Sequence, residues 1–204
     1  ASIEKLLSVM LYPHPVLRAD PKTLAANTRG QPGLWPHAIS GDHPILQVRI
    51  SSQEETALIQ ELLRAHAFWR NRGFTIDLVI VNMKESGYAQ ELQGQLHRLL
   101  QRTNSDAWVN RRGGIFLLNA DQMEEADRVL LDTAARAILD ADKGPLAQQL
   151  AGIDAQPAPP LPEFIPVPAP AEKPAPAPPL ARPADLLFDN GLGGFTPDGR
   201  EYVI

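Results

Sequence analysis

An acidic residue stands next to a histidine at Asp42–His43, just before a short apolar run that begins at Ile45. A carboxylate that holds an imidazole can supply the general base of a catalytic triad. Neighbours on an extended chain usually point apart, however, and open α/β sheets bind ligands at the opposite, carboxyl ends of their strands. We therefore interpret Asp42 as a turn residue that caps a loop. Catalysis by the pair is the alternative hypothesis.

Polar residues also follow the strands predicted below, at the edge of a sheet where a nucleotide or phosphate would bind. The SSQEE sequence after the first strand has no glycine, so neither a dinucleotide fingerprint nor a P-loop is present there. Ser51 and Asp121 each precede a glutamate by three residues, which predicts capping boxes with Glu54 and Glu124. The polar residues at this edge are Ser51, Ser52, Asn82, Lys84, Glu85, Ser86, Asn119 and Asp121.

The remaining motifs predict no cofactor. The NGLGGF sequence at 190–195 resembles a phosphate loop, but no helix is predicted after it. Arg98, Arg102 and the pair Arg111–Arg112 could bind an anion, although a solvated helix face is the commoner role for such charges. The five histidines are scattered, and the absence of cysteine excludes disulfides and thiolate metal sites. No metal site is expected.

The composition excludes two classes of partner. A formal net charge of -5 and a pI near 5.5 argue against a general nucleic-acid binder, which would normally show a basic face. No apolar run approaches the roughly 18 residues of a membrane span, so no membrane contact by this segment is expected. The first residues, ASIEKLL, do not have the pattern of a secretion signal.

Apolar periodicity predicts three strands that alternate with three helices. Such an alternation implies right-handed crossovers, and thus a small parallel sheet covered by helices in an α/β fold. The LVIV run is apolar throughout, as expected for a central strand that is buried on both faces. The predicted elements are strand Ile45–Ile50, helix Glu54–Arg72, strand Phe74–Asn82, helix Tyr88–Gln101, strand Ile115–Leu118 and a helix from Asp121 to about Asp140.

The flanking regions have other patterns. Residues 1–43 are predicted to be the tail of a helix and an ordered loop, which Trp35 would anchor by burial. Residues 44–150 form the α/β domain, and residues 151–184 form a Pro/Ala-rich, semi-rigid linker. In residues 185–204, two apolar runs flank the turn signal Thr196-Pro197-Asp198-Gly199, which predicts a β-hairpin. A lone hairpin is marginal in water, so we expect it to open a larger domain.

Four stretches resemble the large cyclic β-1,2-glucan synthases: Asn27–Ile50, FTIDLVIVN, GGIFLLNADQM and LLFDNGLGGFTPDGREYVI. In that family, a membrane-embedded glycosyltransferase module uses UDP-glucose, and a glycosidase-like module and a cellobiose-phosphorylase-like region follow it. The resemblance places this chain between two β-sandwich domains of the phosphorylase-like region, with residues 185–204 opening the second sandwich. Two positions depart from the expected pattern, because Ala38 replaces a glycine and Asp189 replaces an aromatic residue.

The resemblance also implies where the chemistry lies. An inverting phosphorylase needs a carboxylic acid that protonates the leaving oxygen while phosphate attacks the anomeric carbon. In the family, this acid lies on a helical barrel that would follow the segment, so no catalytic residue is assigned to this chain. The loop Gln31–Pro44 matches the family most closely, and its Trp35, His37 and Asp42 could bind sugar or a neighbouring domain. Packing against the preceding sandwich is the preferred interpretation.

These inferences predict an internal structural segment of a multidomain glucan synthase that holds neighbouring carbohydrate-active domains in register. Its partners would be flanking domains of the same polypeptide, with β-glucan and UDP-glucose or phosphate bound elsewhere in the parent. The parent would lie at the cytoplasmic face of the bacterial inner membrane. The alternative is an independent α/β module that binds a nucleotide, phosphate or glucan at the carboxyl edge of its strands, near Asn82 and Asn119.

Overall fold

The computed structural model describes residues 2–84, 86–155, 181 and 183–204. The chain divides into two compact units, Ala1–Pro159 (unit 1) and Pro160–Ile204 (unit 2). Most of the predicted Pro/Ala-rich linker lies outside the described residues. Its first five residues continue a helix that begins at Leu146.

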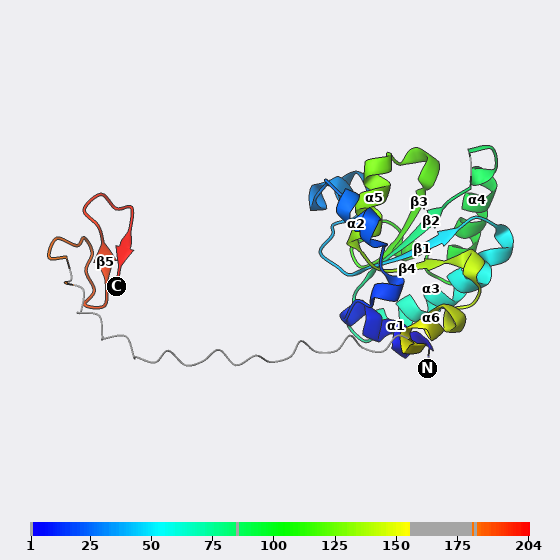
Figure 1. The fold of residues 1–204 in the computed structure, drawn as a ribbon, viewed down its shortest axis with the longest axis horizontal. Coiled ribbons are helices and arrows are strands. Elements are labelled where there is room, and N and C mark those ends of the chain that lie inside the picture. The colour runs from blue at the N-terminus through cyan, green and yellow to red at the C-terminus, as the bar shows by residue number, and fades with distance from the viewer. Residues whose placement is uncertain (1, 85, 156–180, 182) are drawn as a thin grey trace. The chain divides into compact units, whose positions relative to one another are not determined.

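Unit 1 contains a four-stranded parallel sheet with the strand order β3-β2-β1-β4 (Figure 1). The α/β class and the parallel sheet predicted from the sequence are confirmed. β2 is buried along its whole length and lies beside β1 inside the sheet, as its apolar run predicted. The strands are β1 (Ile45–Ile50), β2 (Asp77–Asn82), β3 (Ile115–Asn119) and β4 (Ala135–Asp140).

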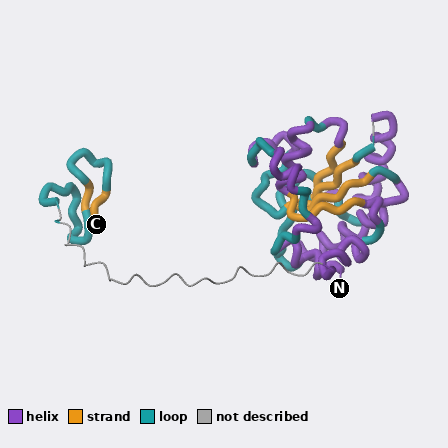
Figure 2. Tube along the Cα trace, viewed as in Figure 1, coloured by secondary structure: helices purple, strands orange, loops and turns teal. Residues whose placement is uncertain are grey.

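Helices cover both faces of this sheet (Figure 2). Side chains alternate along each strand: Leu78 and Ile80 of β2 pack on one face, and Val79 and Val81 pack on the other. The first face carries α1 (Ser2–Leu11), α3 (Thr56–Arg70), α4 (Ser86–Arg102) and α6 (Leu146–Ala155). The second face carries α5 (Glu125–Ala134) and the 3-10 helix η2 (Gln31–His37), beside the short helix α2 (Pro21–Ala26).

The predicted helix from Asp121 to about Asp140 is wrong in its second half. α5 ends at Ala134, and the next six residues form β4 as an edge strand paired with β1. Its burial alternates, with Ala135, Ala137 and Leu139 buried. The sequence AARAILD is rich in good helix formers, so local propensity favours a helix. The open edge of β1 provides a pairing partner and overrides that preference.

Both predicted capping boxes are also corrected. Ser52 and Glu55 form the box, one residue later than predicted, and they open the 3-10 helix η3 (Gln53–Glu55) just before α3. The Glu55 carboxylate accepts hydrogen bonds from the backbone N–H of Ser51 at 2.9 Å and of Ser52 at 3.2 Å. Asp121 lies within the 3-10 helix η5 (Ala120–Gln122) and does not cap α5.

Unit 2 differs in detail from the predicted hairpin. β5 (Gly194–Phe195) pairs with β6 (Tyr202–Val203) along one edge. Along the other edge of β5, Leu187 forms an antiparallel bridge to Phe195. The predicted turn is confirmed, because the Gly199 N–H donates to the Thr196 carbonyl at 2.8 Å. The two apolar runs of the predicted hairpin, 186–188 and 202–204, do not pair with each other, because β5 lies between them. The structure contains no second sheet in the described part of this unit.

Substitution of two glycines of unit 1 by alanine should change the stability of the unit in opposite directions. A Cβ on Gly94, inside α4, would approach only the Arg98 guanidinium, at 3.6 Å. Gly94→Ala should therefore stabilise unit 1 by about 0.5–1 kcal/mol through helix propensity. A Cβ on Gly114 would lie 2.2 Å from the Trp108 carbonyl oxygen, so Gly114→Ala should cost about 2 kcal/mol or more.

Denaturant unfolding followed by tryptophan fluorescence checks both variants, because all three tryptophans, Trp35, Trp69 and Trp108, lie in unit 1. Equal stability of the two variants would contradict the close packing of Gly114 against the Trp108 carbonyl.

Candidate functional site

The loop Gln31–Pro44 covers the second face of the sheet and is anchored by Leu34 and Ile39. Leu34 is 3% exposed, whereas Trp35 is 60% exposed. The prediction that Trp35 anchors the loop by burial is therefore wrong, and its neighbour Leu34 has that role. The 3-10 helix η2 turns Leu34 toward the core cluster that contains Val79 and Phe116. A surface aromatic ring remains at Trp35.

Ala38 ends η2 with a φ of 62° and a ψ of 11°, the left-handed region that favours glycine. It is the position at which the family resemblance leads us to expect glycine. The backbone reverses at Ala38, and the next N–H, that of Ile39, donates to the Leu34 carbonyl at 3.3 Å. Glycine would adopt this conformation without strain, whereas alanine carries a steric cost here.

His37 ties the loop to α5. Its Nε2 lies 3.2 Å from Oδ2 of Asp127, whose Oδ1 accepts a hydrogen bond from Arg29. Arg29 also pairs with Glu124 at 2.7 Å. Burial raises the pKa of Asp127, but the hydrogen bonds from His37 and Arg29 outweigh it and leave the pKa below its usual value. His37 and Asp127 are both largely buried, and their contact joins the loop to the helix.

Asp42 joins the loop to a different part of the chain. Its Oδ2 accepts from Arg112 at 2.8 Å, and its Oδ1 accepts from the Gln31 amide at 3.1 Å. Neither oxygen bonds to His43, so the arrangement required for the Asp42–His43 triad hypothesis is not formed. Asp42 therefore links the end of the loop both to its beginning, at Gln31, and to the turn before β3, at Arg112.

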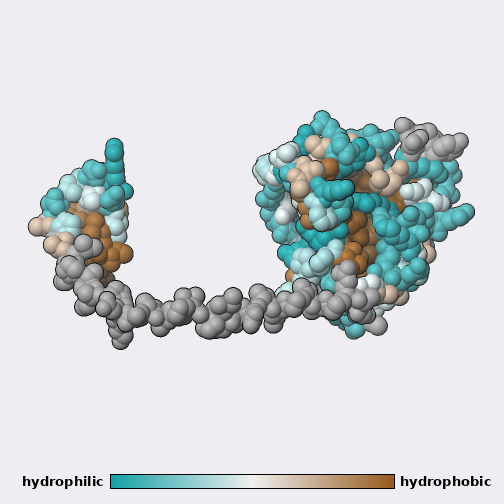
Figure 3. All heavy atoms as spheres, in the orientation of Figure 1, coloured by the Kyte–Doolittle hydropathy of each residue, from teal (hydrophilic) through white to brown (hydrophobic). Residues whose placement is uncertain are grey.

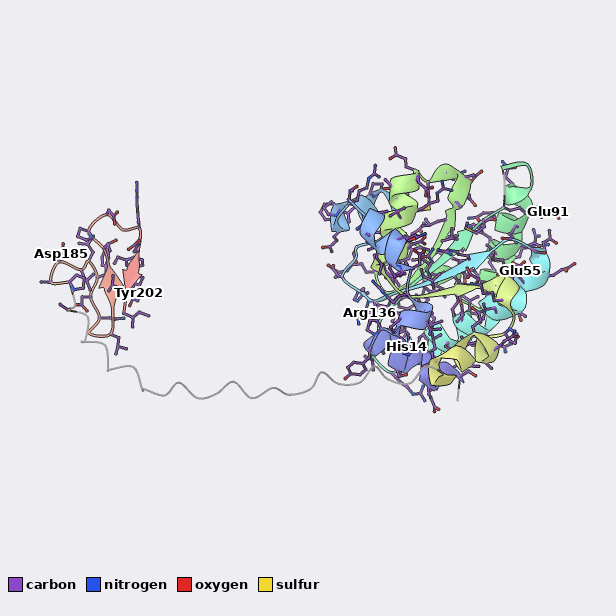
Figure 4. The ribbon with its side chains drawn as sticks, viewed as in Figure 1. His14, Glu55, Glu91, Arg136, Asp185 and Tyr202 are labelled. Atoms are coloured by element: carbon purple, nitrogen blue, oxygen red, sulfur yellow. The ribbon has the colours of Figure 1, made fainter. Side chains whose placement is uncertain are left out.

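A cavity of about 330 Å³ lies at the amino ends of the strands, and Asp42 lines it. Trp35 and His37 are not among its lining residues, so the structure does not bring the three predicted residues together. Carboxylate, amide, imidazole and guanidinium groups surround an apolar floor, a lining that suits a small polar solute. The residues are Gln31, Leu34, Gly41, Asp42, His43, Pro44, Ile45, Leu130, Ala134 and Arg136, the last of which is labelled in Figure 4.

Two buried titratable groups, which the sequence analysis did not single out, hold the peptide of Gly113. Its N–H donates to Asp77 at 2.7 Å, and its carbonyl accepts from His66 at 3.1 Å. Burial raises the pKa of Asp77, against the opposing effects of the Gly113 N–H, His43 and Arg112. Burial lowers the pKa of His66, which favours the neutral imidazole. The sequence signal that could have identified Asp77 is the presence of an acidic residue inside the apolar FTIDLVIVN run.

At the carboxyl edge, Asn82 and Asn119 lie side by side on β2 and β3. Asn82 donates to Asn119 at 3.2 Å and accepts from the backbone N–H of Lys84 at 3.0 Å. The adjacency that the binding-module hypothesis requires is present, but these contacts are internal to the protein. Ser51 and Ser52 belong to the capping region described above, Glu85 lies outside the described residues, and the side chain of Ser86 is not described.

The described ranges contain no cluster of three or more metal-ligating His, Cys, Asp or Glu side chains. Within the same ranges, no helix combines the length and apolar character that a membrane crossing requires.

No protein-family model matches the chain. Its sequence is, however, 36% identical over 210 residues to the cyclic beta-(1,2)-glucan synthase NdvB of Rhizobium meliloti. The match covers the whole chain and 7% of the length of that relative. This chain belongs to the cyclic β-(1,2)-glucan synthase family, and it corresponds to a segment of that relative. The family predicted from the four sequence stretches is confirmed.

The left-handed backbone conformation of Ala38 leads to a testable prediction. Ala38→Gly should stabilise unit 1 by up to about 1 kcal/mol, because glycine adopts the left-handed region without the Cβ penalty. Ala67→Gly, inside α3, is the matched control and should cost about 1 kcal/mol. Urea unfolding of the two variants would show shifts of opposite sign. A loss of stability in Ala38→Gly would contradict the inferred strain.

The Asp127 cluster predicts an acid-sensitive contribution to stability. A carboxylate whose folded pKa is depressed stabilises fully above its unfolded pKa, about 3.9, and loses this contribution as pH falls through the folded value. Asp127→Asn should therefore lower stability at pH 7 and reduce the loss seen below about pH 4. Unfolding free energies measured across this range test it. Asp106→Asn, an exposed site outside this cluster, should leave the wild-type profile unchanged.

Proposed function

We propose that this segment is an architectural part of a multidomain cyclic β-(1,2)-glucan synthase and holds carbohydrate-active domains in register. The observation that carries the proposal is that the whole chain aligns with a small fraction of a much longer enzyme. The geometry supports it, because the side chains best suited to chemistry are occupied by internal contacts. Asp42 and His37 connect the loop to Arg112 and Asp127.

Unit 2 supports a position at the start of a β-sandwich in the phosphorylase-like region. Its strands are two residues long, and an isolated pair of strands is marginal in water. Phe188 is 88% exposed and Leu192 is 79% exposed. Hydrophobic residues of this unit are visible on the face drawn in Figure 3. Further strands from the parent enzyme would cover these side chains and extend the sheet.

In this proposal the parent enzyme supplies all of the chemistry. It would use UDP-glucose in a glycosyltransferase module at the cytoplasmic face of the inner membrane, and act on β-glucan by phosphorolysis in the region that contains this segment. The general acid would lie outside this chain. Trp35, exposed at the surface of the loop, would pack against the preceding sandwich.

A ligand-binding module at the carboxyl edge is the second candidate, favoured by the adjacency of Asn82 and Asn119. A nucleotide, phosphate or glucan would have to compete with the hydrogen bond between the two amides. The cost of breaking this partly buried bond makes the architectural role the better-supported function.

The full-length synthase can separate the two candidates. Gly114→Ala should unfold unit 1 locally, lower the yield of cyclic glucan per enzyme and make the flanking domains more sensitive to limited proteolysis. Gly94→Ala is the matched control in the same unit and should retain full yield. Asn119→Ala, which alters only the carboxyl edge, should also retain it. Loss of yield in a folded Asn119→Ala enzyme, with an unchanged proteolysis pattern, would overturn the proposal and favour ligand binding.

A further inference from the structure

A polar groove of about 370 Å³ lies between the start of α3 and the second half of α4. It is on the face of the sheet opposite the loop Gln31–Pro44, because α3 and α4 pack in the first core cluster. Its polar lining consists entirely of amide, hydroxyl and guanidinium groups. The lining residues are Gln53, Thr56, Gln60, Gln95, Arg98, Leu99 and Arg102.

The two arginines stand one helical turn apart, at positions i and i+4 of α4, and thus on the same face. Both are exposed, and the described residues offer neither of them an ion pair. Some other arginines of the chain do form ion pairs: Arg49 pairs with Asp132 at 2.8 Å, and Arg112 pairs with Asp42. The groove therefore presents two guanidinium groups without an internal counter-ion.

No carboxylate is among the residues that line the groove. Glu55 and Glu91, labelled in Figure 4, come from η3 and α4. Glu55 is occupied by the backbone N–H groups of Ser51 and Ser52, and neither glutamate is a lining residue. The chain has a formal net charge of -5, so an acid-free groove with two positive charges contrasts with the rest of the protein.

This donor set matches a tetrahedral oxyanion. A guanidinium binds phosphate through two parallel hydrogen bonds, and these charge-assisted bonds are about twice as strong as neutral ones. The glutamine amides and the Thr56 hydroxyl add neutral donors.

We propose that the groove binds the phosphate group of a small solute, either inorganic phosphate or a phosphate ester. Arg98 and Arg102 hold the phosphate oxygens, and the amides orient whatever the phosphate carries. The proposal does not rest on the architectural function, because it concerns a different face of the sheet.

The test is a titration of the 204-residue chain with inorganic phosphate, followed by backbone amide chemical shifts at constant ionic strength. Saturable shifts at Thr56, Gln95, Arg98 and Arg102 are expected. Arg98→Gln with Arg102→Gln should weaken the apparent affinity at least about tenfold, since two charge-assisted bonds are removed. Shifts that never saturate, or that sodium chloride reproduces, would overturn the proposal.

Two further double variants provide controls. Arg64→Gln with Arg111→Gln removes the same charge from exposed positions outside the groove and should bind phosphate as the wild type does. Arg98→Lys with Arg102→Lys keeps the charge but loses the planar fork, and should bind more weakly. Wild-type binding by the lysine variant, or weakened binding by the Arg64/Arg111 variant, would show general charge attraction and overturn the site.

A parallel titration with a hexose monophosphate identifies the source of the phosphate group. Equal affinities would assign the groove to phosphate itself, and a tighter ester would show that the glutamines contact the attached sugar. Failure of both titrations would remove this site and leave the architectural proposal untouched, because its test depends on glucan yield and proteolysis in the synthase.

Discussion

The structure of unit 1 depends on covering both faces of a parallel sheet. β1 and β2 lie inside the sheet, and β2 is buried along its whole length, so water can reach neither face without exposing apolar strand surface. In the described structure, four helices cover the first face, whereas α5, with α2 beside it, and the loop that precedes β1 cover the second. Leu34 and Ile39 complete this second core cluster. The loop Gln31–Pro44 is therefore, first of all, part of the core.

Covering a sheet with a loop requires polar links, because a loop cannot satisfy its backbone groups by itself. Asp127 connects His37 and Arg29 to α5, and Asp42 connects the loop to Arg112. The turn that carries Arg112 is itself fixed at the next residue, Gly113, by Asp77 and His66. Gly113 has a φ of 66°, and a Cβ added there would overlap Thr75. Residue types that suggest catalysis in the sequence thus serve to hold separate parts of the fold together.

Most of the fold could be predicted from the sequence, because apolar runs and helical periodicity report burial directly. β4 could not, since the Ala-rich segment at 135–140 has no strand preference of its own and pairs only because β1 has a free edge. Trp35 and Leu34 are adjacent and both apolar, and only the turn of η2 decides which is buried. The links of Asp42 and His37 join positions far apart in the sequence, so no local pattern could predict them.

The two faces of the sheet can serve different purposes within one synthase. The second face is occupied by the loop and its ion pairs, and substitutions there act on the core. The first face is covered by complete helices, whose outer side chains are free to vary without exposing the sheet. Arg98 and Arg102 lie on that outer side, where an unneutralised pair of guanidiniums has no packing role in the described structure. The proposed packing of Trp35 and the proposed phosphate site therefore lie on opposite faces of the sheet.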